Sequence, residues 1–539
     1  MLPAALFDAG SVRELDRIAI EEQGITGISL MRRAAVACVE VAQARWPEAK
    51  SALVYCGNGN NAGDGYLIAG ILAQRDFKVD VVVVGDVDKL GADARKAYRF
   101  CQNSDAVINN LAPQVFSQSA DLIFDALLGT GLKGPVRDRF AAVIDSINRQ
   151  ADATSTPVVA VDLPSGLSAD SGRILGVAIR AQATVTFIGT KRGLLTADGP
   201  DHSGTLYFDD LEVPQAVFDR LPPDAVLLSE HMMKGSLPKR PRNSHKNKFG
   251  HILVVGGDEG MGGAVAMSAE AALRSGAGLV SVATHPTHAQ ALLVRTPELM
   301  VRGVLFDDPD LDKPNDTPEA GIGRSTIERL LNQCSVIVLG PGLGSSSWSR
   351  QMFEIVMSHS AQSGKPMVVD ADGLNMMTVG VERRDSWILT PHPGEARRLI
   401  SNLPASQNVS DDYQGIAEVE LDQANADRFS MSALLHRTYG GAVILKGVGS
   451  LINDGEQISL CPYGNPGMSS AGMGDVLSGV AGALLGQGLS VSLAAKQAVL
   501  MHALAGDRAV AVAGERGLLA TDLIPHLRKL SNEFDSHDR

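Results

Sequence analysis

The chain has 539 residues, which is too long for one ordinary hydrophobic core and predicts at least two domains. Its formal net charge of −13, from 48 basic and 61 acidic residues, argues against sequence-independent binding to nucleic acid or to an anionic membrane. No uncharged apolar stretch approaches the roughly 20 residues of a membrane span, and no secretory signal is evident. The five cysteines are scattered singly, as expected for free thiols in a reducing cytoplasm.

The first part of the chain alternates apolar strands with amphipathic helices. Its helical patterns include Tyr66–Arg75, in which Leu67, Ile68, Ile71 and Leu72 share one face. Near-continuous Val/Ile/Leu strands between helices predict a parallel sheet that is covered on both faces. The expected strands are Ala52–Cys56, Val79–Val84, Leu122–Leu127, Val158–Val161 and Thr184–Ile188.

The second part of the chain repeats this alternation after a change in composition. Pro214–Phe249 is rich in proline and then basic, so we interpret it as a linker followed by the entry strand of a second domain. We predict an α/β protein with two three-layer α/β/α domains, residues 1–228 (Rossmann-like) and 229–539. The expected strands of the second domain are Ile252–Val255, Leu279–Ala283, Val336–Leu339, Met367–Val369, Trp387–Leu389, Ala442–Leu445 and Leu451–Ile452.

Two glycine-rich segments of the first domain formally satisfy the dinucleotide fingerprint. They are Gly57–Gly65, which we expect to be a loop before the helix, and Gly129–Gly134. A tight turn would explain such a match alone, but it would not require the amide pair Asn60-Asn61. Asp125 and the Asp162–Gly166 segment end neighbouring strands, so these loops should share one pocket. Asn61, Asp125 and Ser165 offer hard oxygen ligands for a weakly charged cation and not for zinc.

These loops resemble the N-terminal epimerase domain of the NAD(P)H-hydrate repair enzymes. The family loop Gly-x-Gly-Asn-Asn-Gly-Gly-Asp-Gly matches residues 57–65 with Ala62 in place of one glycine, and Val161–Gly166 matches in full. The resemblance implies interconversion of the R and S forms of the hydrate, and potassium bound by Asn61, Asp125 and Ser165. We assign acid/base catalysis to Asp162. The implied substrate-binding residues are Asn60, Asn61, Ala62, Gly63, Asp64, Gly129, Thr130, Gly131, Leu132, Lys133, Gly134, Pro135 and Asp162.

The most informative segment of the second domain is Asn465–Gly479. Small residues precede an apolar helical pattern, so bare backbone N–H groups at a helix start should bind an anion. Asp475 would repel a phosphate if binding were its only role. It is better explained as a base directed at a hydroxyl group beside the phosphate. The segment therefore predicts phosphoryl transfer to an alcohol.

Further loops of this domain lie at strand ends, and the set resembles the ribokinase-like NAD(P)H-hydrate dehydratases. The segments that carry this resemblance are Pro391–Glu395 and the Asn-Pro-Gly-Met and Gly-Met-Gly-Asp parts of Asn465–Asp475, and no Walker-type phosphate loop is present. The resemblance covers roughly residues 246–530 and implies catalysis by Asp475. It implies hydrate binding by Ala264, Gly342, Gly344, His392 and Asp475, and nucleotide binding by Lys446, Gly447, Val448, Gly449, Ser450 and Gly474.

The pairing of these two domains implies a bifunctional NAD(P)H-hydrate repair enzyme. Phosphate is a far better leaving group than hydroxide, so phosphorylation of the hydrate followed by elimination would regenerate NAD(P)H. We expect Mg²⁺ and ADP, or ATP, as cofactors, with AMP and phosphate released if ADP is the donor. Glu395 either orders the magnesium through water or stabilises a helix start. Homo-oligomerisation is expected from the family.

Three alternatives compete with this hypothesis. A vitamin or sugar kinase of the same fold would explain Asp475 but would leave the first domain without a role. A non-enzymatic binding module predicts loss of the polar set of the first domain, which is present. An NAD-dependent dehydrogenase is suggested only by the glycine fingerprints, with Asp86 as its best ribose-binding candidate. The choice between ADP and ATP, and between NADH and NADPH hydrates, stays open.

Overall fold

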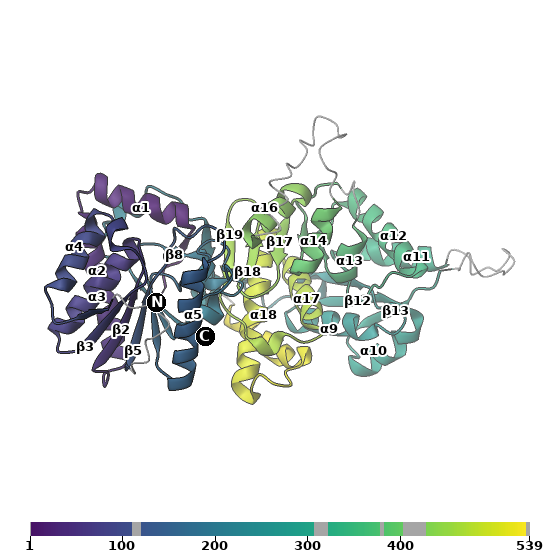
Figure 1. Ribbon diagram of the computed structural model, residues 1–539. Helices are drawn as coiled ribbons and strands as arrows, with labels where there is room; N and C mark the ends of the chain where they lie inside the picture. The colour runs from purple at the N-terminus through teal and green to yellow at the C-terminus, as the bar shows by residue number, and fades with distance from the viewer. Residues whose placement is uncertain (1, 110–119, 307–321, 378–381, 403–426, 535–539) are drawn as a thin grey trace. The chain divides into compact units, whose positions relative to one another are not determined.

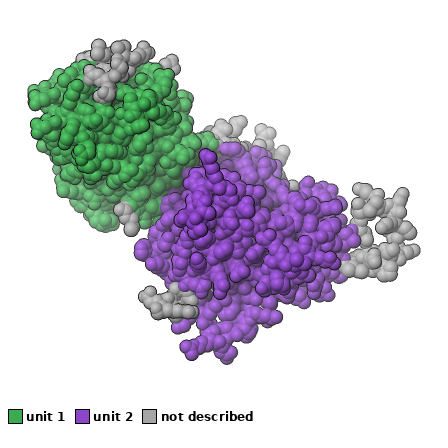
Figure 2. Space-filling view, turned by 90° about the horizontal axis from the view of Figure 1, so that it is seen from below, with its two compact units in different colours: residues 1–227 green, residues 228–539 purple. Residues whose placement is uncertain are grey.

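The computed structural model describes residues 2–109, 120–306, 322–377, 382–402 and 427–534. The chain divides into two compact units, Met1–Leu227 (unit 1) and Leu228–Arg539 (unit 2). Figure 2 shows the two units in different colours. Each unit has its own hydrophobic core, so each is described separately.

Unit 1 is built on a seven-stranded sheet in which every neighbouring pair of strands is parallel (Figure 1). The strand order reverses between β2 and β5, which places the loops after these two strands side by side. Such a switch point is where ligands bind in open parallel sheets. In sheet order the strands are β4 (Val107–Asn109), β3 (Lys78–Val83), β2 (Ser51–Cys56), β5 (Leu122–Ala126), β6 (Val158–Val161), β7 (Ala183–Phe187) and β9 (Thr205–Asp209).

Helices cover both faces of this sheet because alternate strand residues are apolar on both sides. In β2, Val54 and Cys56 belong to the cluster formed with α2, α3 and α4, whereas Leu53 and Tyr55 belong to the cluster formed with α5. Two-sided burial of this kind is typical of parallel sheets. The helices are α1 (Ala9–Glu21), α2 (Gly27–Arg45), α3 (Asn60–Gln74), α4 (Ala92–Gln102), α5 (Asp138–Thr154), α6 (Gly199–Ser203) and α7 (Gln215–Phe218).

Three short strands of unit 1 lie outside its seven-stranded sheet. Strand β1 (Ala5–Phe7) pairs antiparallel with β10 (Ala225–Leu227) and parallel with β8 (Thr190–Lys191). These short strands were not predicted from the sequence. One of them, β8, is important for the site because it brings Lys191 to the carboxyl ends of the strands of the seven-stranded sheet.

The largest local difference from the sequence prediction is the start of α3. The Gly57–Gly65 segment was expected to be a loop before the helix, but α3 begins at Asn60. Gly59 is the N-cap residue and makes no side-chain hydrogen bond, so the usual sequence signal for a helix start is absent. Asn60, Asn61 and Asp64 therefore project from the first turns of a helix.

Unit 2 contains a mixed sheet that is parallel from β13 to β17 and antiparallel from β17 to β19. Its strand order reverses between β11 and β14, which brings the loops after these strands together. In sheet order the strands are β13 (Met300–Gly303), β12 (Leu279–Thr284), β11 (His251–Val255), β14 (Val336–Leu339), β15 (Met367–Val369), β16 (Trp387–Leu389), β17 (Ala442–Leu445), β18 (Ser450–Asn453) and β19 (Ile458–Cys461).

The main core of unit 2 lies between this sheet and the helices α9, α17, α18 and α19. Helix α17 packs along α9 and α18, and its interior glycines permit this close approach: a Cβ at Gly479 would lie 2.0 Å from the carbonyl oxygen of Ser268. The helices of unit 2 are α8 (Glu230–Met233), α9 (Gly262–Arg274), α10 (Ala289–Arg295), α11 (Ile322–Gln333), α12 (Ser347–Ser363), α13 (Ala371–Met376), α14 (Pro393–Ser401), α16 (Arg428–Tyr439), α17 (Met473–Gly486), α18 (Val491–Ala513) and α19 (Ile524–Glu533).

Within the described parts of the chain, no helix is both long enough and apolar enough to cross a membrane.

Candidate active sites

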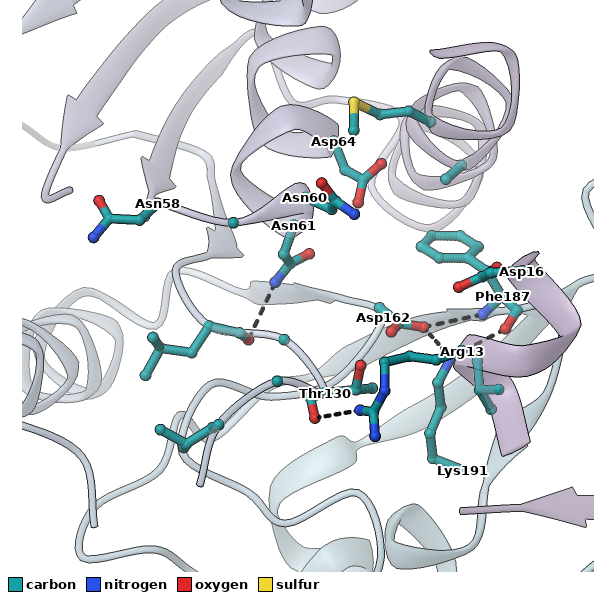
Figure 3. A pocket seen from close by; sticks show the side chains of 18 of the residues that line it. Arg13, Asp16, Asn58, Asn60, Asn61, Asp64, Thr130, Asp162, Phe187 and Lys191 are labelled. Carbon is teal, nitrogen blue, oxygen red and sulfur yellow. Dashed lines mark hydrogen bonds and ion pairs between the residues drawn. The ribbon is translucent and has the colours of Figure 1, made fainter. Parts of the chain in front are cut away.

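A cavity of about 790 Å³ lies in unit 1 at the switch point of the sheet. The segments that line it include the loops after β2, β5 and β6, together with α1 and the first turn of α3 (Figure 3). The close approach of two of these loops requires glycine, because a Cβ at Gly57 would lie 1.9 Å from the carbonyl oxygen of Leu127. The volume of the cavity is typical of a site that binds a small ligand.

Asp162 is the central polar residue of this cavity. It directly follows β6 in a left-handed conformation with φ of 69°, which is unusual for a residue with a side chain. Its Oδ1 atom accepts hydrogen bonds from Lys191 Nζ, from Thr186 Oγ1 at 3.3 Å and from the backbone N–H of Phe187 at 3.3 Å. Its Oδ2 atom has no hydrogen-bond partner among the described residues.

Lys191 is the cation that balances Asp162, and sequence reasoning missed it. Its side chain is only 1% exposed, and its ammonium also donates to Thr186 Oγ1 at 3.2 Å and to the carbonyl of Phe187 at 3.0 Å. Its three partners are Asp162, which follows β6, and Thr186 and Phe187 of β7. This fixed ammonium orients the carboxylate of Asp162 in the cavity wall.

Two further carboxyl groups line the cavity, from Asp16 on α1 and Asp64 on α3. Burial raises the pKa of Asp16 to about 6; Lys191 opposes this rise and Asp162 adds to it. Burial, followed by the charges of Asp162 and Asp16, raises the pKa of Asp64 well above its usual range. Three carboxyl groups therefore surround one lysine.

Asn61, Asp125 and Ser165 come together next to the cavity, on three different elements. Asp125 is fully buried; its carboxylate accepts hydrogen bonds from the backbone N–H of Ser165 at 2.7 Å and from Ser165 Oγ at 2.6 Å. Asn61 donates to the carbonyl of Leu128 at 3.2 Å, but its buried Oδ1 has no partner within the described structure. An unused amide oxygen beside a buried carboxylate suits a weakly charged cation.

The other predicted residues of unit 1 do not all face the cavity. Ala62 and Gly63 are buried; a Cβ at Gly63 would lie 2.5 Å from Met31 Sδ on α2. The residues that do line the cavity are Asn60, Asn61, Asp64, Gly129, Thr130, Gly131, Leu132, Lys133, Pro135 and Asp162. Gly134 lies within the same loop with φ of 76° and is exposed.

In unit 2, the loops after β11 and β14 bring several predicted residues together. The backbone N–H of Asp258 donates to the carbonyl of Gly342 at 2.8 Å, and a Cβ at Gly342 would lie 3.0 Å from the Cβ of Ala264. Gly344 donates its N–H to Asp372 Oδ2 at 2.8 Å. Ala264, Gly342 and Gly344 therefore form one surface at the carboxyl ends of these strands.

Asp370, Glu395, Lys446 and Asp475 form a second cluster, which we call the unit 2 charge cluster. Lys446 donates to Asp370 Oδ1 at 2.8 Å and lies 3.9 Å from Glu395 Oε2. Burial raises the pKa of Asp475 to about 7; the charge of Asp370 adds to this rise and Lys446 opposes it. The pKa of Asp475 therefore lies in the range where a carboxyl group exchanges protons near neutral pH.

Lys446, which the resemblance implies to be a nucleotide-binding residue, lies among acidic groups in the structure. Burial acts to lower its pKa, but Asp370 and Glu395 outweigh burial and raise the pKa above its ordinary value. A Cβ at Gly474 would lie 3.2 Å from Lys446 Nζ, so the lysine reaches the start of α17. Asp370 directly follows β15, and its buried Oδ2 has no partner in the described structure.

His392 and Glu395 form a capping box at the start of α14. His392 Nδ1 accepts from the N–H of Gly394 at 2.9 Å, and Glu395 Oε2 accepts from the N–H of His392 at 2.7 Å. This geometry supports the helix-start interpretation of Glu395, although its carboxylate also faces Lys446.

The Lys446–Ser450 loop is held by Arg428, which sequence reasoning also missed. Arg428 donates to the carbonyls of Leu445 at 3.0 Å and Lys446 at 3.1 Å, and also to Val448 and Gly449. The carbonyl oxygens are thus occupied by the guanidinium, whereas Gly447 and Val448 are exposed. The start of α17 has Gly472 as N-cap without a side-chain hydrogen bond, which leaves N–H groups for an anion.

Together these features are those of an enzyme with two candidate active sites, one in a Rossmann-like unit and one in a unit that carries a half-buried aspartate at a helix N-terminus. Residues 27–193 match the family described as YjeF-related protein N-terminus, and residues 252–529 match the family described as NAD(P)H-hydrate dehydratase. The chain belongs to the family of bifunctional NAD(P)H-hydrate repair enzymes. The rival identification as a kinase with an idle first domain is therefore not favoured.

Relatives with this name span both units. The Coxiella burnetii enzyme is 42% identical over 98% of this chain and 99% of its own length. The Escherichia coli enzyme is 36% identical over 98% of this chain and 95% of its own length.

Solved structures resemble part of the chain. A ribokinase-like superfamily protein from Enterococcus faecalis is 26% identical, with a TM-score of 0.46, and covers 58% of this chain and 96% of its own. An ADP/ATP-dependent NAD(P)H-hydrate dehydratase from Bacillus subtilis, co-crystallized with ATP/Mg²⁺, is 23% identical, with a TM-score of 0.44, and covers 57% of this chain and 97% of its own.

Proposed function

We propose that the chain repairs hydrated nicotinamide cofactors by two reactions, one in each unit. Unit 1 interconverts the R and S forms of NAD(P)H hydrate, and unit 2 uses a nucleotide to dehydrate the S form to NAD(P)H. The observation that carries the proposal is the presence, in one chain of this family, of an aspartate close to a lysine in each unit: Asp162 pairs with Lys191, and Asp475 lies at the start of α17 within the field of Lys446. Asp162 and Asp475 are the proposed catalytic residues.

Epimerisation in unit 1 requires proton transfer at one ring carbon. This carbon bears the hydroxyl group and is bonded to the ring nitrogen. Asp162 Oδ2 is free to take a proton, since the three donors to this carboxylate all contact Oδ1. The loop that contains Gly129–Pro135 and the first turn of α3 would bind the remainder of the hydrate. Arg13 donates to the carbonyl of Thr130 at 3.4 Å and helps to hold this loop.

Potassium is the cation that we propose for Asn61, Asp125 and Ser165. The unused Oδ1 of Asn61 and the buried carboxylate of Asp125 fit such an ion, and burial raises the pKa of Asp125 to about 6 in its absence. When bound, the ion would supply positive charge that balances this carboxylate and fixes the loops around it.

In unit 2, Asp475 takes the proton from the hydroxyl group of the S hydrate, and the oxygen attacks the terminal phosphorus of the nucleotide. The N–H groups at the start of α17 and the ammonium of Lys446 stabilise the negative charge of the phosphoryl group. The C–O bond then breaks with phosphate as the leaving group, and loss of a ring proton restores the double bond. Phosphate leaves more easily than hydroxide because its conjugate acid is much stronger.

We propose that the phosphoryl donor is ADP, or ATP, with Mg²⁺. Glu395 and the unpartnered Oδ2 of Asp370 are hard oxygen atoms of the kind that hold Mg²⁺, directly or through water. When bound, the ion would neutralise phosphate charge. We further propose a cytoplasmic location, which the five buried free cysteines support, and a homo-oligomeric state.

The experiment that tests the proposed function uses the purified full chain with mixed R and S hydrate, Mg²⁺, K⁺ and either ADP or ATP. Absorbance of reduced nicotinamide reports the product. Recovery of the whole pool is expected with at least one nucleotide, and comparison of the two identifies the donor. Recovery of only the S fraction would contradict the role of unit 1, and no recovery with either nucleotide would contradict the proposed function.

A further inference from the structure

We propose that Asp16 is the second catalytic residue of unit 1: it donates a proton to the departing hydroxyl group while Asp162 accepts a proton from the incoming water. This inference rests on the proposed epimerase function. Asp16 lies on α1, in a helical pattern that gives no functional signal, so only the fold reveals its position.

The geometry places Asp16 and Asp162 in one cavity, on different elements. Asp16 lines the cavity from α1, while Asp162 lines it from the end of β6 (Figure 3). Asp16 makes no hydrogen bond or ion pair with any described residue, so its half-buried carboxyl group has no structural partner. A carboxyl group that is partly removed from water and is not used in packing contacts is available to substrate.

The two carboxyl groups have opposite electrostatic surroundings. Asp162 accepts from three donors, including the ammonium of Lys191, which hold its Oδ1 atom in place. Asp16 lacks such donors, and burial with the nearby charge of Asp162 favours its protonated form. Pairs of carboxyl groups whose surroundings favour different protonation states can divide the roles of acid and base between them.

The reaction needs both roles at once. The C–O bond breaks, its electron pair leaves with the oxygen, and that oxygen takes the proton of Asp16 and departs as water. The ring nitrogen supplies electrons to form a C=N bond. Water then adds to the other side of the carbon, the electrons return to nitrogen, and Asp162 takes the proton that the water loses.

Atoms and electrons balance, because one water leaves and one enters, and no oxidant or reductant takes part. One proton has moved from Asp16 to Asp162, and exchange with solvent returns it. The reverse reaction uses the same two residues with their roles exchanged. A single carboxyl group would have to serve both faces of the ring.

Asp64 is the other carboxyl group that could fill this role. It is on α3, where it faces both Asp16 and Asp162. Other charged groups that line the cavity are Arg13 on α1, Asp93 on α4, Lys133 and Arg137 after β5, and Lys191 on β8. We assign the proton to Asp16 because α1 follows β1, which pairs with β8, and this places Asp16 on the side of the cavity where Lys191 holds Asp162. A pKa of about 6 agrees with a proton that exchanges near neutral pH.

The test uses the full chain without nucleotide, so that dehydration does not occur, and follows the interconversion of R and S NADH hydrate by NMR. Asp16→Asn is expected to lower kcat by about a hundredfold or more, the usual contribution of a general acid, with little change in KM. Asp16→Glu, which keeps the acid, is expected to restore most of the rate. Glu21→Gln, on the exposed side of the same helix, is the matched control and should leave the rate unchanged.

The pH profile separates catalysis from a structural effect. In the wild-type chain, kcat/KM for epimerisation should fall as the pH rises above about 6, because Asp16 loses its proton, and this fall should be absent in Asp16→Asn. Asp16→Asn should fold at least as stably as wild type at pH 8, since it removes a carboxylate that burial disfavours.

Three results would overturn the inference. They are an Asp16→Asn rate within threefold of wild type, an unchanged alkaline fall in that variant, and a failure of Asp16→Glu to recover activity. If wild type itself does not interconvert the two forms, the proposed function of unit 1 fails and the inference fails with it. The wild-type trace therefore distinguishes the two failures.

Discussion

At the scale of single residues, Asp475 makes dehydration depend on pH in the neutral range. Burial and the nearby Asp370 raise the pKa of Asp475 to about 7, so below this pH the carboxyl group is protonated and cannot act as a base. We expect kcat/KM for dehydration of the S hydrate to fall about tenfold for each pH unit below 7 and to level off above it. Steady-state rates on either side of pH 7 test this dependence.

The matching substitution is Asp475→Asn, which keeps the shape of the side chain and removes the base. We expect dehydration to be lost across the whole pH range while epimerisation continues at the wild-type rate. Wild-type dehydration in this variant, or loss of both activities in a folded protein, would contradict the assignment of Asp475.

Lys446 should control the pKa of Asp475. The lysine lowers this pKa, so Lys446→Met is expected to shift the acidic limb of the dehydration profile to higher pH, in addition to reducing the rate. Lys496→Met is a matched control because Lys496 also contacts an aspartate, Asp454, and its side chain is 20% exposed against 21% for Lys446. The control should lose stability without moving the pH limb, and an equal shift in both variants would contradict a local effect.

At the scale of secondary structure elements, the proposed cation site links α3, β5 and the loop after β6. A bound ion that is absent from the unfolded chain stabilises the folded state by about 2.7 kcal/mol at a concentration one hundred times its Kd. We expect K⁺ to raise the Tm of unit 1 relative to tetramethylammonium at equal ionic strength. Asp125→Asn should remove this difference, which differential scanning calorimetry measures.

The control for the cation site is Asp121→Asn. Asp121 lies just before β5, is exposed, and accepts hydrogen bonds from the backbone N–H groups of Lys50 and Ser51. This variant should lose some stability but keep the dependence on K⁺. Persistence of the K⁺ effect in Asp125→Asn would show that the ion binds elsewhere.

The limits of sequence prediction are also clearest at this scale. Strands such as Val158–Val161 and Val336–Leu339 have the predicted bounds because burial on both faces makes them continuously apolar. The start of α3 was misplaced by six residues since its Asn- and Gly-rich first turn has the composition of a loop.

Residues whose partners are far away in the sequence could not be found from local sequence patterns. Lys191 contacts Asp162 from a two-residue strand that lacks any strand signal, and Arg428 contacts the Lys446–Ser450 loop from the start of a separate helix. The positions of Asp162 and Asp475 could be predicted because a proline-containing strand end marks the first and a glycine-rich helix start marks the second. Their charge partners depend on the tertiary fold.

At the scale of the whole molecule, each proposed site is complete within its own unit. The cavity of unit 1 is lined by residues between Val12 and Leu211, whereas the unit 2 charge cluster is drawn from residues between Asp370 and Asp475. We therefore expect that the S hydrate made by one chain can be dehydrated by another. Asp162→Asn and Asp475→Asn, each inactive in a different unit, allow this expectation to be measured.

An equimolar mixture of these two full-length variants should convert the whole pool of R and S hydrate to NADH when nucleotide is present. Asp162→Asn alone should convert the S fraction quickly and the R fraction only as fast as spontaneous epimerisation, and Asp475→Asn alone should convert neither. In the mixture, the rate for the R fraction should rise in proportion to the concentration of Asp475→Asn, because that variant supplies the epimerase. The doubly substituted chain, added in its place, controls for any effect of total protein. If the R fraction in the mixture stays at the spontaneous rate while wild type converts it quickly, the hydrate must pass between the two sites of a single chain, and independent sites would be contradicted.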